Sequence, residues 1–245
     1  MTAVATSVVD EIVAALATVS DPELDEPITT LGFVRSIRVD DTKVVVHLRL
    51  PTSFCSPNFA YLMASDSVDA LRRVGGLGQV VVQLDDHHDS DKINAGLAAD
   101  AGYVGTFGVE AETSLDELRR IFRHKAHTAA MERCAEALLK GSGTTVDDLH
   151  QVTLADLPEG PHKEALLRRR VAIGLGVLPD APVLVDEDGS PLAADAVPLR
   201  LRFAKAVRIS IEGNSHFCRG LLATRYADVE PDGMSIRVTN ARSTS

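Results

Sequence analysis

Hydrophobic residues in the first 85 positions recur at spacings that predict a series of short elements. Apolar side chains three and four apart indicate a helix, whereas apolar residues that alternate with polar ones indicate a strand. The predicted elements are a helix over 7–18 with Ser7 as its N-cap, strands over 33–39 and 43–50, a helix from Pro57 to Arg73, and a strand over 79–84. The polar turn DDT joins the first two strands into a hairpin. We therefore predict an α/β (α+β) fold that begins with a small αββαβ unit.

The rest of the chain has a different pattern. Small and polar residues over 85–108 predict an irregular connection. The elements predicted beyond it are a long helix from Ser114 to Lys140 with Ser114 and Glu117 at capping-box spacing, a helix from Pro161 to Ile173, and a strand and turn over 181–192. The stretch 200–226 fits a strand and a helix equally well. The predicted domains are 1–90, a connection over 91–113, and a mixed, helix-rich α/β domain over 114–245.

Composition and charge exclude several classes of protein. The chain has 245 residues with a formal net charge of −10, which disfavours non-specific binding to nucleic acid or to an anionic membrane. It has no apolar run near ~20 residues, so no transmembrane helix is expected, and the N-terminus lacks the pattern of a signal peptide. Three cysteines far apart in sequence fit a reducing cytoplasm better than a disulfide framework.

Four residues form the first candidate site. Cys55 lies between the predicted strand over 43–50 and the helix that starts at Pro57, and a helix start carries positive partial charge that favours a thiolate. The hairpin can bring the loop with Asp21 and Glu23 near Thr52 and Cys55, where a carboxylate could accept the thiol proton or share a bound cation. From spacing alone, a half-buried structural cysteine stays the favoured reading.

These residues carry a resemblance to a known family. The segment DPELDEPITTLGFV, the hairpin, and a Thr-x-x-Cys before a helix together resemble the SufT/PaaD-like iron–sulfur cluster assembly family over residues 7–86. The positions that match its motif are Asp21, Pro22, Glu23, Leu31, Gly32, Thr52 and Cys55. The chain departs from the family pattern in having Ser56 rather than proline after the cysteine, and in lacking a tryptophan. The resemblance implies an αββαβ domain that helps to load iron or an iron–sulfur cluster, held transiently, onto client proteins.

The longer form of the chain resembles accessory proteins of bacterial multicomponent di-iron monooxygenases. Its distinguishing segments are FCSPNFAYLM, DDHHDSDKINAG and the added C-terminal domain. This narrower resemblance implies that the client metalloenzyme is a di-iron hydroxylase.

Two further groups contain potential metal ligands, but for both we favour a structural role without metal. Residues 85–91, DDHHDSD, offer imidazole and carboxylate groups, but neighbouring side chains in extended backbone point apart, so a solvated acidic loop is expected. His124, His127 and Cys134 share one face of the predicted long helix, where such a stripe more often packs in a core.

His216 and Cys218 form the last candidate pair. Two apart in a strand, they would face the same side and approach one metal, iron or zinc. If the C-terminal region folds over the first domain, Cys55 and Cys218 would converge. A homodimer that joins two copies of Cys55 is the other arrangement left open.

We therefore expect an assembly or maturation factor rather than an enzyme. It would bind its client metalloenzyme and pass metal through Cys55. A metal-free adaptor or chaperone-like module is the alternative, and a cysteine hydrolase has no recognised motif to support it. The basic run at Arg168, Arg169 and Arg170 is expected to be a solvated helix face, with a docking patch for an acidic client as its alternative.

Overall fold

The computed structural model describes residues 7–111, 115–141, 143–227 and 235–242. Its strands are β1 (Ser20–Asp21), β2 (Glu26–Pro27), β3 (Val34–Val39), β4 (Lys43–Leu48), β5 (Gln79–Leu84) and β6 (Arg237–Asn240). Its α-helices are α1 (Val8–Leu16), α2 (Pro57–Arg72), α3 (Ser90–Ala98), α4 (Gly102–Phe107), α5 (Leu115–Gly141), α6 (Pro161–Ala172) and α7 (Val197–Tyr226). Short 3₁₀ turns lie at Gly108–Glu110, Leu149–Gln151, Leu154–Asp156 and Ala194–Ala196. The fold is α+β, as predicted.

The described chain divides into two compact units. The first comprises residues 1–115 and 214–245, and the second comprises residues 116–213. Helix α7 belongs to the second unit up to Gly213 and to the first unit from Asn214 onward. Compact packing does not by itself define domains, so the boundaries predicted at 1–90, 91–113 and 114–245 stay a prediction.

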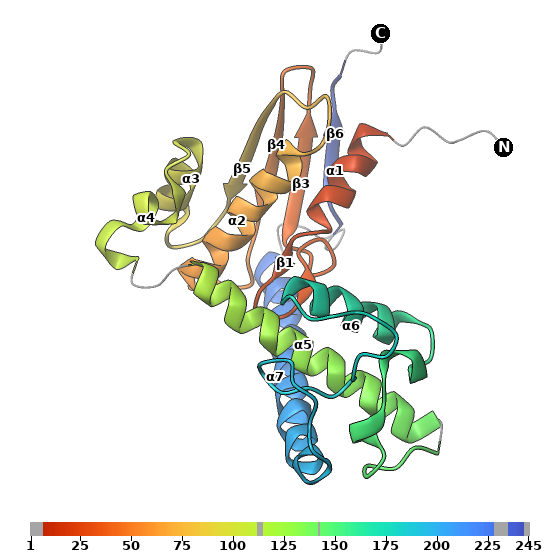
Figure 1. The fold of residues 1–245 in the computed structure, drawn as a ribbon. Helices are drawn as coiled ribbons and strands as arrows, with labels where there is room; N and C mark the ends of the chain where they lie inside the picture. Colours follow the sequence, from red (N-terminus) through yellow and green to blue (C-terminus); the bar gives the residue numbers. More distant parts are fainter. Residues whose placement is uncertain (1–6, 112–114, 142, 228–234, 243–245) are drawn as a thin grey trace, which may run out of the picture. The chain divides into compact units, whose positions relative to one another are not determined.

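A four-stranded sheet with the order β5-β4-β3-β6 forms the centre of the first unit. The predicted hairpin is confirmed: β3 and β4 pair antiparallel, and Asp40 closes their turn by accepting the backbone N–H groups of Thr42 and Lys43. Strand β5 pairs parallel with β4. Helices α1 and α2 contact each other and lie against one face of the sheet (Figure 1).

The ends of these two helices follow from their sequences. Ser7 is the N-cap of α1, and its side chain exchanges hydrogen bonds with Asp10 in a capping box. Pro57 occupies the first turn of α2, where its missing N–H costs nothing. The predicted start of each helix is therefore confirmed to within a residue.

The irregular connection predicted over 85–108 was wrong in most of its length. Residues 90–98 and 102–107 form α3 and α4, and α3 packs against β5. Burial explains the difference, since Ile93 and Phe107 join the same core as the sheet. Tertiary packing of a few apolar residues stabilises helices whose small and polar residues would not form them alone.

Strand β6 is an element that the sequence pattern did not predict. It pairs parallel with β3, with Ser36 opposite Arg237 and Val39 opposite Asn240. The sheet therefore takes its edge strand from the far end of the chain (Figure 1).

The second unit is largely helical and has its own core. Met131 and Cys134 of α5 are buried there with Leu166 of α6, which confirms packing for this part of the predicted His/Cys stripe. The predicted long helix is α5, but its proposed cap at Ser114 lies outside the described residues. Of the strand and turn predicted over 181–192, the turn is confirmed, since Asp186 Oδ1 accepts the backbone N–H groups of Asp188 and Ser190. The strand was wrong, because the segment forms only the isolated bridges Thr153↔Pro182 and Val185↔Pro191.

Arg170 also departs from expectation. It is 2% exposed and donates to the carbonyl oxygens of Gly176 and Pro182, whereas Arg168 is solvated beside Glu164. The guanidinium is buried because it satisfies loop carbonyls that would otherwise lack partners.

None of the described helices is long and apolar enough to cross a membrane.

Candidate functional site

Cys55 lies in the loop between β4 and α2, directly before Ser56, the N-cap of α2. The thiol is free and half-buried. Its sulfur lies 3.5 Å from Thr52 Oγ1, which also accepts the backbone N–H of Phe54. The loop therefore holds the thiol next to the positive end of α2.

A second loop, residues 85–88, is bonded to the Cys55 loop. His87 Nε2 lies 2.8 Å from the carbonyl oxygen of Cys55, and its Nδ1 accepts the backbone N–H of Asp89 at 3.1 Å. Since Nδ1 accepts, Nε2 carries the proton and donates to Cys55. His88 donates its own backbone N–H to the carbonyl oxygen of Ser53 at 2.9 Å. His87 thus supports the cysteine loop.

This arrangement corrects the expectation of a solvated acidic loop over 85–91. His87 is only 5% exposed, and both of its ring nitrogens are occupied. His88 is exposed, and its ring faces Phe54 with centroids 5.8 Å apart. The two imidazoles therefore have different environments, as expected for neighbours that point apart.

The acidic loop that follows α1 has a buried carboxylate at Asp21. Its Oδ1 accepts the backbone N–H groups of Glu23 at 2.8 Å and Leu24 at 2.9 Å. Burial raises the pKa of Asp21 from its ordinary 3.8 to about 6, although these two hydrogen bonds oppose the rise. A carboxylate that is costly to ionise is unusual in a structural turn and marks a candidate functional position.

The second half of α7 lies along this acidic loop. Asn214 donates to Glu23 Oε1 at 3.2 Å, and Ser215 and Arg219 both donate to Glu26. These contacts bring a helix from the far end of the chain onto the loop that follows α1. The sequence alone gives no sign of this pairing.

Cys218 occupies the same stretch of α7 and packs against the hydrophobic core that Cys55 also contacts. Burial raises the pKa of Cys218 to about 11, and the negative charges of Asp21, Cys55 and Glu23 raise it as well. The structure therefore gathers both thiols and the two carboxylates in one neighbourhood of the first unit.

His216 does not join this group. Residues 200–226 are helical, so side chains two apart point about 200° away from each other around the axis. Cys218 is half-buried while His216 is exposed. The shared face expected for a strand is therefore absent. Across the described ranges, no group of three or more His, Cys, Asp or Glu side chains is placed to hold a metal ion.

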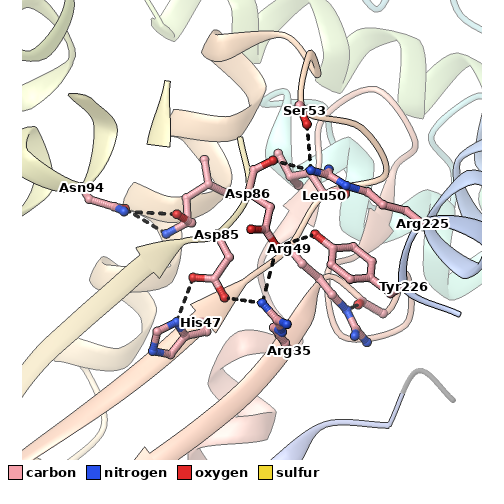
Figure 2. Close-up of polar contacts among 12 residues, drawn as sticks. Arg35, His47, Arg49, Leu50, Ser53, Asp85, Asp86, Asn94, Arg225 and Tyr226 are labelled. Carbon is pink, nitrogen blue, oxygen red and sulfur yellow. Dashed lines mark hydrogen bonds and ion pairs between the residues drawn. The ribbon is translucent and has the colours of Figure 1, made fainter. Parts of the chain in front are cut away.

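A network of charged residues lies beside the cysteine loop (Figure 2). Asp85 accepts from Arg35 Nη1 at 3.0 Å and lies 2.9 Å from His47 Nδ1. Arg225 and Tyr226, the last residues of α7, reach the same place. Sequence reasoning considered His87 only as part of a solvated loop and missed Arg225 and Tyr226, because each acts through a contact with a distant segment.

The first unit is thus an α+β fold in which a cysteine at a helix start, an acidic loop and a second thiol lie in one neighbourhood. Residues 9–84 match the family model described as iron–sulfur cluster assembly protein. An uncharacterized protein of Methanocaldococcus jannaschii is 30% identical over 86 residues, which cover 35% of this chain and 88% of that protein. No solved structure matches the chain significantly. The chain belongs to the iron–sulfur cluster assembly protein family.

Membership has a general functional consequence. The family supports a role in iron–sulfur cluster assembly in general, and an assembly factor implies interaction with client proteins. The match ends at residue 84, so α7 and β6 lie outside it although they belong to the same compact unit.

Proposed function

We propose that this protein carries iron or an iron–sulfur cluster to a client metalloenzyme through the thiol of Cys55. The observation that carries the proposal is the grouping of two free thiols with Asp21 and Glu23 inside the first compact unit. Thiolates are the ligands that iron–sulfur clusters take in proteins, and Cys55 lies at the start of α2 inside the segment that matches the family.

The remaining site residues have supporting roles in this proposal. Cys218 supplies a second thiolate from α7, after losing a proton that its surroundings hold strongly. Asp21 and Glu23 provide an acidic wall, and Thr52 orients the Cys55 sulfur. His216 is exposed on another face of α7 and would need a client or a second chain to join the site.

The finer identity of the factor follows from sequence resemblance. The motif residues around Asp21 and Cys55 support a SufT/PaaD-like role, and the extended C-terminal part supports a client of the di-iron hydroxylase type. The iron is cargo in this scheme, so a site with fewer than a full ligand set suits its release.

A metal-free adaptor is the second candidate. It is favoured by one observation: the described residues contain no complete ligand group for a metal ion. In that case Cys55 is structural, and the protein binds its client without carrying iron.

The deciding measurement is iron and acid-labile sulfide per chain after anaerobic reconstitution. Wild type is compared with Cys55→Ala, Cys218→Ala and the matched control Cys134→Ala, whose thiol is buried in the other unit. We expect iron in wild type and Cys134→Ala, its loss in Cys55→Ala, and weaker retention in Cys218→Ala. Equal iron in wild type and Cys55→Ala would contradict carriage by Cys55, and its absence from every variant would favour the adaptor. Two chains per cluster would indicate a homodimer.

A further inference from the structure

The last turn of α7 is hydrogen-bonded to two loops, one at Leu50 and Ser53 and the other at Asp86 (Figure 2). Arg225 Nη1 donates to the carbonyl oxygen of Leu50 at 3.0 Å. Its Nη2 donates to Ser53 Oγ at 2.8 Å and to the carbonyl oxygen of Asp86. One guanidinium therefore satisfies three acceptors on two loops that are separate in sequence, which only the fork of an arginine does well.

The backbone of Asp86 has a conformation that these contacts stabilise. It has a φ of 55°, in the left-handed region that residues with a Cβ disfavour. Its carbonyl oxygen is held by Arg225, and its carboxylate accepts from Tyr226 at 3.2 Å and from Arg35 at 3.5 Å. A conformation that is intrinsically disfavoured persists only when its surroundings determine it.

The buried ring of Tyr226 packs against Arg225 and two other arginines. Its ring is 4% exposed, and the guanidinium groups of Arg35, Arg49 and Arg225 face it at 5.3–5.5 Å from the ring centroid. The cations are therefore stacked on an aromatic ring that is fixed in place. Arg225 is held in its position from both sides.

Hydrogen bonds between the two loops connect the Arg225 contacts to Cys55. Ser53, which Arg225 holds, accepts the backbone N–H of His88. Two residues later, the carbonyl oxygen of Cys55 accepts from His87. The segment from Leu50 to Cys55 is thus fixed to residues 85–88 at its two ends, by Arg225 at the first and by His87 at the second.

We propose that Arg225 is a positioning residue for the Cys55 thiol, and that the end of α7 is a working part of the cysteine site. The importance of this position rests on the proposed function, but the effect on the loop does not. Arg225 lies beyond the residues that match the family model, so this contact reaches the cysteine loop from outside the matched segment.

The test uses the metal-free full chain and compares Arg225→Ala with Arg225→Lys and Arg219→Ala. Arg219 is a matched control, because its hydrogen bonds join the same helix to Glu26 and to Ser215. Two readouts are taken. Hydrogen exchange follows the amides of Phe54 and His88, and mass spectrometry follows the alkylation of Cys55. Urea unfolding reports whether each variant stays folded.

In Arg225→Ala we expect both amides to exchange and Cys55 to alkylate about tenfold faster, as local opening of a released loop predicts. Exchange in β3 and β4 should not change. Millimolar methylguanidinium should restore the slow rates, whereas methylammonium should not. Arg225→Lys should give intermediate rates, since lysine keeps the charge and lacks the planar fork.

Three outcomes would overturn the proposal: unchanged rates in Arg225→Ala, equal effects in Arg219→Ala, or no rescue by methylguanidinium. If Arg225→Ala does not fold, the decision passes to Arg225→Lys, whose wild-type rates would refute the role. This test uses metal-free protein, so its result does not depend on whether the protein carries iron. A failure of the loop-positioning role would likewise leave the iron measurements unaffected.

Discussion

Replacing Asp21 by asparagine should stabilise the metal-free protein at neutral pH. Asp21 is 7% exposed, and burial raises its pKa from 3.8 to about 6. Asparagine keeps an oxygen that can accept the N–H groups of Glu23 and Leu24. It removes only the charge that burial penalises.

The magnitude follows from the shift in pKa. Each unit corresponds to about 1.4 kcal/mol, so the ionised carboxylate lowers the free energy of unfolding by up to about 3 kcal/mol. The folded-state pKa lies above the unfolded value. The stabilising contribution of protonated Asp21 is therefore full below pH 3.8 and is lost as the pH rises through about 6. We expect Asp21→Asn to exceed wild type by about 1–3 kcal/mol at pH 7.5, with a difference that shrinks to about 0.5 kcal/mol or less near pH 4.

Urea unfolding between pH 4 and 8, with a chelator present, measures this difference. All three tyrosines, Tyr61, Tyr103 and Tyr226, belong to the first unit and the chain has no tryptophan, so tyrosine fluorescence follows that unit alone. Asp40→Asn is the matched control. Hydrogen bonds from the Thr42 hydroxyl and backbone lower the pKa of Asp40, so its loss should destabilise the protein at pH 7.5. A difference for Asp21→Asn that is constant with pH, or that favours wild type at pH 7.5, would refute the reasoning.

Two other pKa shifts give further predictions. Burial and nearby negative charge raise the pKa of Cys218 to about 11, so its alkylation by iodoacetamide should increase about tenfold per pH unit through pH 10; a plateau near the ordinary value of about 8.5, seen by peptide mass spectrometry, would contradict this. Burial, with Arg170 and Arg200, lowers the pKa of His127 from 6.5 to about 4. The stability that neutral His127 provides is present above pH 6.5 and is lost as the pH falls toward 4. Relative to His127→Gln, wild type should lose about 2 kcal/mol between pH 6.5 and 5 in urea unfolding followed by circular dichroism. A parallel pH profile for the two proteins would count against the buried, neutral imidazole.

Local patterns in the sequence determined helices α1 and α2 and strands β3, β4 and β5 of the first unit. Ser7 and Asp10 cap α1, Pro57 begins α2, and the polar turn after Val39 closes the hairpin. These features depend on residues within a few positions of each other. Strand alternation and helix caps therefore predicted them correctly. Cys55 and Asp21 were recognised as motif residues in the same way, from the residues next to them in the sequence.

Elements that depend on distant contacts were not predictable in this way. Residues 200–226 fitted both a strand and a helix, and only packing made them α7. The spacing of His216 and Cys218 was read for a strand, so the helix moved them to different faces. Periodicity describes which face a residue takes once the element is known, but it does not choose the element for an ambiguous segment.

The composition of the candidate site shows the same division. The sequence by itself determined the family core and its helix-start cysteine, because these are encoded in contiguous motifs. Only the tertiary structure decided that Cys218 shares a neighbourhood with Asp21, and that Arg225 holds a loop 175 residues earlier in the chain. Such contacts arise from chain segments that meet only after folding, and no pattern within either segment specifies its partner.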